Sequence, residues 1–317
     1  MSDTIRAGTL ALGHGHTMYY EDSGRLDGVP VVYLHGGPGA AMEPHMRGLH
    51  DLQATRFIMF DQRGCGRSSP PGGLAFNDTV HLVEDIERLR RHLGIERWIV
   101  SGGSWGSTLA LVYAQAHPQC CMALVLRGVF LGTQAEMDWL AEGAPNFFPE
   151  DWFLATGVGP GEAPLKRLKE LQQAVLAPGD DKASLRAAQA LARFEWTASA
   201  MQADRCAIDA ELTPGYTSAY QRVCCHYLRN GCFVDPKALL TGLERIRHLP
   251  CYIVNGRYDV VCPPVAAWRL KQAWPEAELE IVPMAGHTST EPAMANALRA
   301  LMRRVTASVV SVQGTGL

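Results

Sequence analysis

A serine between two glycines, at the junction of a strand-like and a helix-like segment, narrows the folds open to this chain more than any other feature. Residues 102–106 read Gly-Gly-Ser-Trp-Gly, between an apolar run at 98–100 and a helix-forming stretch at 107–116. Glycines on both sides relieve crowding in a tight strand-to-helix turn, and the helix amides that follow favour negative charge above the serine. The pattern predicts a turn that exposes the Ser104 hydroxyl as a nucleophile. An ordinary glycine turn is the alternative.

Short apolar runs alternate with amphipathic stretches in the first half of the chain, a pattern typical of a parallel sheet with crossover helices. Several runs are continuously apolar, as expected for strands that are covered on both faces. Residues 79–93 place apolar side chains about 3.6 residues apart and predict a helix before the strand that leads to Ser104. The expected fold class is α/β. The predicted strands are Met18–Glu21, Val31–His35, Phe57–Asp61, Trp98–Ser101 and Ala123–Arg127.

The character of the sequence changes at residue 134. Residues 134–246 are rich in Trp, Ala, Leu and Pro without an alternating pattern, which predicts helices. Strand patterns return at Cys251–Asn255 and Glu278–Val282, with a helix at about 265–274 between them. We therefore expect one core, formed by residues 1–133 and 247–317, into which residues 134–246 are inserted as a helical cap.

Composition excludes several classes of function. The 317 residues are 47% hydrophobic, enough for a large core, and the net charge of −3 shows no basic excess for nucleic acid or anionic membranes. The longest apolar run, residues 120–126, is too short to span a bilayer. Nine cysteines without a Cys-x-x-Cys pair, and an amino terminus without the apolar part of a secretion signal, favour the cytoplasm. We expect a small-molecule or short-peptide substrate and no metal or cofactor, and leave the oligomeric state open.

Two later positions supply partners for the serine. Asp259 and His287 each follow one of the last two predicted strands, and the carboxyl ends of parallel strands share one edge of a sheet. A serine nucleophile needs a base and a group that orients the base, and the chain order Ser104, Asp259, His287 is that of α/β-hydrolases. Asp61 also ends a strand, but its place before the nucleophile favours a turn cap or an ion pair.

The glycine-rich segment after the strand at 31–35 is the expected second half of an oxyanion hole. Residues 35–39 read His-Gly-Gly-Pro-Gly, and glycines let the backbone approach a ligand closely. Two backbone N–H groups commonly stabilise the negative charge of a tetrahedral intermediate. We expect these donors to be the amides of Trp105 and Gly37, and we expect His35 to be a structural hydrogen-bonding group.

Taken together, these segments resemble the proline iminopeptidase family, serine peptidases of the α/β-hydrolase fold that release N-terminal proline. The resemblance extends over nearly the whole chain. It implies the α/β-hydrolase fold with an inserted helical cap and a triad of Ser104, Asp259 and His287. The matching segments are His35–Gly39, Asp61–Ser68, Gly102–Leu111, Leu126–Phe130, Gly256–Asp259 and Ala285–His287.

The resemblance also implies a substrate site in the cap. Family members are understood to bind the free amino group of the substrate with acidic residues and to hold the proline ring among aromatic side chains. Residues 194–196, Phe-Glu-Trp, resemble the family's Trp-Glu element, so we expect Glu195 to bind an ammonium group. Phe130 and Arg127 match the family and are expected to form part of the pocket wall.

Other positions in the cap depart from the family pattern. Residues 223–228 read Val-Cys-Cys-His-Tyr-Leu where the family resembles Ile-Glu-Asn-His-Tyr-Phe. Cys224 therefore replaces a second glutamate, and Leu228 replaces a pocket phenylalanine. Residues 138–141, Asp-Trp-Leu-Ala, lack the aromatics that the family carries after the tryptophan. Loss of one of two carboxylates reduces capture of an N-terminal amine by about tenfold to a hundredfold.

Three functions follow from these residues. The first is a serine hydrolase that forms an acyl-enzyme, an aminopeptidase releasing N-terminal proline or another small residue from peptides. The second is an esterase or amidase of broader or different specificity, which the altered cap favours. The third is a non-catalytic small-molecule binder. Serine at position 104 argues against epoxide hydrolases and haloalkane dehalogenases, which use aspartate there.

Overall fold

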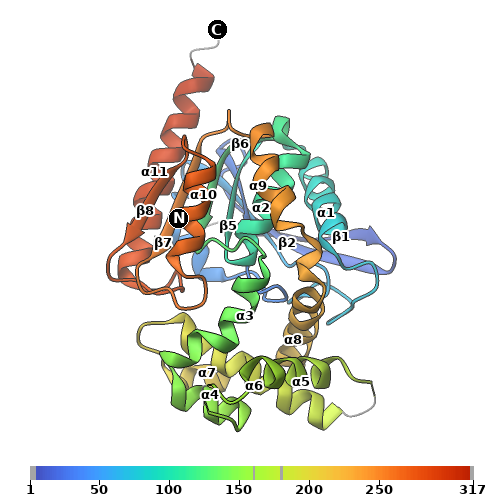
Figure 1. Ribbon diagram of the computed structural model, residues 1–317. Helices are drawn as coiled ribbons and strands as arrows, with labels where there is room; N and C mark the ends of the chain where they lie inside the picture. The colour runs from blue at the N-terminus through green and yellow to red at the C-terminus, as the bar shows by residue number, and fades with distance from the viewer. Residues whose placement is uncertain (1–4, 160, 179–180, 315–317) are drawn as a thin grey trace.

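The computed structural model describes residues 5–159, 161–178 and 181–314, and within them the chain forms an eight-stranded sheet (Figure 1). The strand order is β1-β2-β4-β3-β5-β6-β7-β8. Strand β2 pairs antiparallel with β1 and β4, and all other neighbours are parallel, so the predicted α/β class is confirmed. The strands are β1 Ile5–Gly13, β2 His16–Gly24, β3 Val29–Leu34, β4 Thr55–Phe60, β5 Trp98–Gly103, β6 Cys121–Arg127, β7 Cys251–Gly256 and β8 Glu278–Val282.

Helices cover both faces of the sheet. Alternate residues of paired strands point to opposite sides, so Val32 and Val100 pack with α1, α2 and α10, while Val31 and Ile99 pack with η1 and α11. The predicted helices at 79–93 and 265–274 correspond to α1 and α10. Sequence patterns did not predict β1 or α11. The bounds are η1 Pro44–Leu49, α1 Thr79–His92, α2 Trp105–Ala116, α10 Pro264–Ala273 and α11 Pro292–Gly314.

The segment between β6 and β7 is helical, as predicted. Helices α3 to α8 gather at one end of the sheet (Figure 1), and several of them share a core of their own in which the rings of Trp152 and Phe194 lie 5.0 Å apart. Leu239, by contrast, packs with the helices on the sheet. The division at 134 and 246 stays a prediction. The helices are α3 Gln134–Glu142, η3 Ala144–Asn146, α4 Pro149–Thr156, α5 Pro164–Leu176, α6 Asp181–Ser199, α7 Arg205–Glu211, α8 Pro214–Arg229, η4 Gly231–Phe233, α9 Pro236–Thr241 and η5 Gly242–Arg245.

The sequence predicts neither a membrane span nor a secretion signal, and the structure bears on the first of these. Across the described ranges, no helix has both the length and the apolarity needed to cross a membrane. Residues 1–4, which belong to the amino-terminal stretch expected to lack a secretion signal, lie outside the described residues. All nine cysteines are free thiols.

The order of the strands brings the two glycine-rich segments together. Strand β3 lies between β4 and β5. The chain therefore adds β4 on one side of β3 and the later strands β5 to β8 on the other. Crevices at points where the strand order reverses in this way, beyond the carboxyl ends of the strands, are the usual ligand sites of α/β sheets. Leu34 pairs with Gly102 near the ends of β3 and β5. The loop that begins at His35 and the turn that contains Ser104 therefore leave the sheet side by side.

Close backbone packing explains the glycines around Ser104. A Cβ atom on Gly106 would overlap the carbonyl oxygen of Leu34, and one on Gly102 would overlap the carbonyl oxygen of Gly106. Backbone atoms of a central strand and a helix start cannot move apart without breaking the sheet pairing. Both positions therefore exclude any side chain, and the turn stays closed.

We predict that Gly106→Ala lowers the free energy of unfolding by about 2 kcal/mol, because its methyl group must push against the Leu34 carbonyl. Urea denaturation followed by circular dichroism measures the change. Gly215→Ala is the matched control, since outside its chain neighbours and the backbone of its own helix no atom lies within 4 Å of its added Cβ, and it should change stability by less than about 1 kcal/mol. Equal losses in the two variants would contradict this account of the turn.

Candidate active site

Ser104 occupies a strained position between β5 and α2. Its backbone dihedrals are φ 57° and ψ −127°, a region that residues other than glycine rarely adopt. The turn is held by hydrogen bonds: the Ser104 amide donates to the carbonyl of Arg127 at 2.9 Å, and the hydroxyl of Ser107 donates to the carbonyl of Ser104 at 2.7 Å. The constraint raises the Ser104 side chain at the amino-terminal end of α2, where it borders a cavity.

His287 and Asp259 meet beyond the ends of β8 and β7, as their strand positions predicted. Nδ1 of His287 lies 2.8 Å from Oδ2 of Asp259, and both side chains are buried. The other carboxylate oxygen of Asp259 accepts the amide of Cys262 at 2.7 Å. A proton on Nδ1 is the form that fits this carboxylate partner, and it leaves Nε2 able to accept a proton.

The Ser104 hydroxyl has a different neighbour. Among the hydrogen bonds of the described residues, Oγ of Ser104 pairs with Sγ of Cys262 at 3.8 Å, and none joins it to His287. Hydrogen bonds between catalytic groups are often long without substrate and tighten when it binds. The three predicted triad members therefore converge on one edge of the sheet, with the histidine and aspartate already joined. Sequence patterns did not single out Cys262.

The loop after β3 lies beside Ser104. A Cβ atom on Gly36 would lie 3.1 Å from Cβ of Ser104, and Gly37 lines the same cavity as the serine. His35 donates from Nδ1 to the carbonyl of Gly36 at 3.0 Å, while its Nε2 accepts the amide of Gln62 at 3.0 Å. Burial lowers the pKa of His35, so the ring is neutral and holds the loop. Its partners are those of a structural histidine, as expected.

Gln62 connects the loop to the residue after the nucleophile. Its side-chain amide donates to the carbonyl of His35 at 2.9 Å and accepts from the indole N–H of Trp105 at 3.1 Å. One side chain thus joins Trp105 to His35, the first residue of the loop that contains Gly37. Sequence patterns assigned no role of its own to Gln62. In the sequence it stands out only as part of residues 61–68, one of the segments that carry the family resemblance.

Asp61 has the structural role that its position predicted. Its two carboxylate oxygens accept the backbone amides of Met42 at 2.7 Å and Arg67 at 2.9 Å. Both acceptors are therefore occupied by loop backbone, and the side chain is almost fully buried. It caps turns, and the aspartate that contacts His287 is Asp259.

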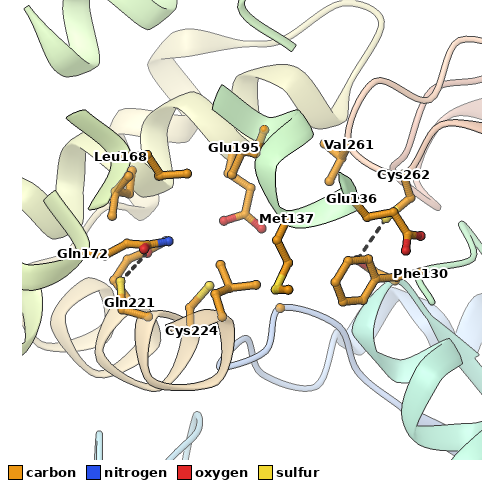
Figure 2. Close-up of a pocket in the computed structure, with 16 residues that line it drawn as sticks. Phe130, Glu136, Met137, Leu168, Gln172, Glu195, Gln221, Cys224, Val261 and Cys262 are labelled. Atoms are coloured by element: carbon orange, nitrogen blue, oxygen red, sulfur yellow. Dashed lines mark hydrogen bonds between the residues drawn. The ribbon is translucent and has the colours of Figure 1, made fainter. Parts of the chain in front are cut away.

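A cavity above Ser104 is formed largely by helices α3, α5, α6 and α8 (Figure 2). Five of the residues expected to bind substrate or stabilise the oxyanion line it, and apolar side chains from α3, α5 and α6 form much of the remaining wall. The expected residues in the lining are Gly37, Phe130, Glu195, Cys224 and Leu228, and the apolar ones that were not expected are Met137, Leu140, Leu168 and Leu191.

Arg127 is the exception among the expected substrate-binding residues. It is buried, does not line the cavity, and donates from Nη1 to the carbonyl of His287 at 2.5 Å. The expected position in the pocket wall is therefore corrected: Arg127 lies behind the turn of Ser104 and holds the loop of His287. The reason is topological, because β6, which ends at Arg127, lies directly between β5 and β7.

Glu195 extends from α6 into the cavity (Figure 2). Burial raises the pKa of its carboxyl, while the hydroxyl of Tyr220, which donates to Oε2 at 2.6 Å, acts in the opposite direction. A second carboxylate, Glu136, also lines the cavity. Its oxygens accept the amide and hydroxyl of Thr133 and the amide of Leu131, so they cap α3. Glu195 is therefore the cavity carboxylate available to a ligand in this lining.

Comparison with known proteins agrees with this geometry. A profile of the alpha/beta hydrolase fold matches residues 29–291. A proline iminopeptidase of Xylella fastidiosa is 44% identical over 92% of this chain and 93% of its own, and one of Neisseria gonorrhoeae is 43% identical over 93% and 94%. The chain belongs to the proline iminopeptidase family of α/β-hydrolases. A solved proline iminopeptidase-related protein of Thermus thermophilus is 25% identical and superposes with a TM-score of 0.65, over 98% of this chain and 99% of its own.

In this member of the proline iminopeptidase family, the cavity beside Ser104 is lined by polar as well as apolar side chains. Among the residues that the structure describes, no group of three or more His, Cys, Asp or Glu side chains is arranged to hold a metal. The cavity lining offers carboxylate, amide and thiol groups beside the serine. These groups can bind and orient an acyl substrate.

In this family member, the cap is hydrogen-bonded directly to the histidine loop. The carbonyl of Ser199, at the end of α6, accepts the amides of His287 and Thr288, each at 2.9 Å. Glu291 bridges the same two segments, because its carboxylate accepts the amide of Met201 at 2.7 Å and that of Gly286 at 2.5 Å. Helix α6 also carries the cavity carboxylate. Sequence patterns did not identify Glu291, which only the folded chain brings between cap and core.

We predict that Glu291→Ala lowers kcat for p-nitrophenyl acetate by about tenfold, because two backbone amides that hold the histidine loop lose a charged acceptor. This small ester has no amino group, so the change reports on the catalytic loop. Glu291→Gln keeps one acceptor oxygen and should lose less. An unchanged kcat in Glu291→Ala would show that the loop is held without the bridge.

Proposed function

We propose that this protein is a serine aminopeptidase that releases N-terminal proline or another small residue from peptides. The observation that carries the proposal is the cavity in which one available carboxylate, Glu195, faces the same space as Ser104. A free amino group bound at Glu195 would present the adjoining carbonyl carbon toward the serine. The membership of the proline iminopeptidase family supports this assignment.

The chemistry follows from the residues at the sheet edge. Oγ of Ser104 attacks the carbonyl carbon as its proton passes to Nε2 of His287, and the amides of Gly37 and Trp105 stabilise the oxyanion. The bond to the leaving amine breaks as His287 returns the proton to it. Water then attacks the acyl-enzyme with His287 as base and restores the serine. Asp259 holds the imidazole in the tautomer that these proton transfers require.

The proposed substrate class rests on the size and charge of the cavity. Apolar side chains such as Phe130, Leu140 and Leu228 would contact a small ring, and Glu195 would pair with the ammonium group. The nine free thiols suit a reducing compartment, so we propose that the enzyme acts on short peptides in the cytoplasm. Residues 134–246 would act as the cap over the cavity.

A broader esterase or amidase is the second candidate, and Cys224 favours it. This thiol lines the cavity where the resembling family carries a second glutamate, so one of two charges for an ammonium is missing. Steady-state rates on proline 2-naphthylamide and p-nitrophenyl acetate separate the candidates. A strong preference for the prolyl amide supports the aminopeptidase, and comparable kcat/KM values support the broader hydrolase.

We predict that a fluorophosphonate probe labels the wild-type protein and that Ser104→Ala abolishes the label, because the strained serine is the proposed nucleophile. Intact-protein mass spectrometry gives the stoichiometry. Cys224→Ala and Cys262→Ala are controls for two of the three cavity thiols and should still be labelled. A wild-type protein that takes no label would favour the non-catalytic binder.

We also predict a substrate-dependent effect of pH. Burial raises the pKa of Glu195 above its ordinary value of 4.5, so the carboxyl becomes neutral at a higher pH than an exposed glutamate. As pH falls through that raised pKa, attraction for an ammonium is lost. The ratio of kcat/KM for proline 2-naphthylamide to that for p-nitrophenyl acetate should therefore fall. In Glu195→Gln the ratio should be low and independent of pH, and a wild-type ratio without pH dependence would contradict this role.

A further inference from the structure

Gln221 brings an unpaired hydrogen-bond donor to the cavity. It lies on α8, one turn before Cys224, lines the cavity, and is only 2% exposed. Its carbonyl oxygen Oε1 accepts from the thiol of Cys225 at 3.9 Å, which orients the amide. Nε2 has no hydrogen-bond partner among the described residues. A buried donor without a partner is unfavourable, so a ligand that offers an acceptor at this point is favoured.

Nε2 of Gln221 lies near the carboxylate that is proposed to bind the substrate, but it makes no hydrogen bond of ordinary geometry to it. The amide of Gln221 and the hydroxyl of Tyr220 both oppose the rise in the pKa of Glu195 that burial causes. Tyr220 satisfies one carboxylate oxygen, Oε2. In Figure 2, Glu195 lies between the end of the cavity at Cys262 and the end at Gln221. The amide donor and the carboxylate acceptor thus line one cavity, and Gln221 lies toward the end away from Cys262, the thiol beside Ser104.

A neighbouring acceptor and donor complement a particular chemical group. An ammonium group offers donors only, so it satisfies Glu195 and leaves Nε2 of Gln221 unpaired. A neutral amide offers an N–H to the carboxylate and an adjacent carbonyl oxygen to Nε2. Cys224 adds to this preference, because a second carboxylate at its place in the lining would repel that carbonyl oxygen.

We propose that Glu195 and Gln221 together form a subsite for a neutral amide at the amino-terminal end of the acyl group, and that the enzyme also releases N-terminal 5-oxoproline. The 5-oxoprolyl group is a five-membered lactam of nearly the size of proline, so it fits the same apolar walls. The lactam N–H donates to Glu195, and its carbonyl accepts from Nε2 of Gln221. The proposal rests on the proposed function, because the acyl transfer at Ser104 is unchanged.

Two substrates that differ at a single position of the ring test the subsite. The 2-naphthylamides of L-proline and L-5-oxoproline differ in one carbonyl oxygen and in the charge on nitrogen. We expect the wild-type enzyme to hydrolyse both, with kcat/KM values within about tenfold of each other. Gln221→Glu removes the donor and adds a carboxylate, so it should lower the ratio of 5-oxoprolyl to prolyl kcat/KM by at least about tenfold. Gln221→Leu, which only removes the donor, should lower the ratio in the same direction.

Gln172 provides the matched control. It comes from α5, lines the same end of the cavity and is also buried (Figure 2). It is not one of the two residues of the proposed subsite. Gln172→Leu should leave the ratio of the two substrates within about threefold of the wild-type value. A second readout does not require amide hydrolysis: 5-oxoprolinamide should inhibit p-nitrophenyl acetate hydrolysis by the wild type, and at least about tenfold more weakly in Gln221→Leu.

The outcomes separate this proposal from the proposed function. Hydrolysis of the prolyl but not the 5-oxoprolyl amide, or a ratio that neither Gln221 variant changes, would overturn the subsite and leave the aminopeptidase intact. Fluorophosphonate labelling without hydrolysis of either amide, and without inhibition by 5-oxoprolinamide, would overturn both the subsite and the aminopeptidase. It would leave a serine hydrolase of another specificity. Absence of labelling would remove the proposed function, and the subsite with it.

Discussion

The pairing of β3 with β5 is the constraint on which the rest of the site depends. Leu34 and Gly102 are partners near the ends of these strands, and the backbone of Gly106 packs against the Leu34 carbonyl without room for a side chain. This contact closes the turn and holds Ser104 at a positive φ. It also places the loop of Gly36 against the serine, so the nucleophile and one expected oxyanion donor are positioned by the same backbone contact.

Hydrogen bonds connect the turn of Ser104 to the His287 loop and, through that loop, to helix α6. Arg127 links them, because its carbonyl accepts the Ser104 amide and its guanidinium donates to the carbonyl of His287. The His287 amide in turn donates to Ser199 at the end of α6, and Glu291 bridges the same two segments. A displacement of α6 would therefore act on both the cavity carboxylate and the catalytic loop. In the proposed mechanism, substrate binding and catalysis would therefore depend on the same helix.

In the proposed function, recognition of the substrate depends on a few polar groups in a mostly apolar cavity wall. Glu195 keeps one oxygen for Tyr220 and faces the cavity, whereas the carboxylate of Glu136 is used up in capping α3. Buried polar groups discriminate strongly, because a ligand that leaves one of them unpaired loses binding energy. In the proposed subsite, the neutral side chains Gln221 and Cys224 would therefore matter as much for the choice of substrate as the charge on Glu195.

Much of the core, and the positions of the candidate catalytic residues at strand ends, followed from the sequence because both depend on local pattern. Apolar runs predicted β3 to β8 within a few residues, and the carboxyl ends of two of them identified Asp259 and His287 before any contact was known. The edge strand β1 and the long helix α11 were not predicted. For β1 the reason is that only one of its residues is buried, so its apolar signal is weak.

The sequence by itself determined the chemistry of this protein: a serine in a glycine-flanked turn, with a histidine and an aspartate at strand ends in the order of an α/β-hydrolase. Only the tertiary structure decided that Arg127 lies outside the cavity, that Glu291 bridges α6 and the His287 loop, and that Gln221 and Glu195 line the same cavity. The physical reason is distance along the chain. Turns and strand ends are set by neighbouring residues, whereas the cavity is built from helices whose packing no local pattern specifies.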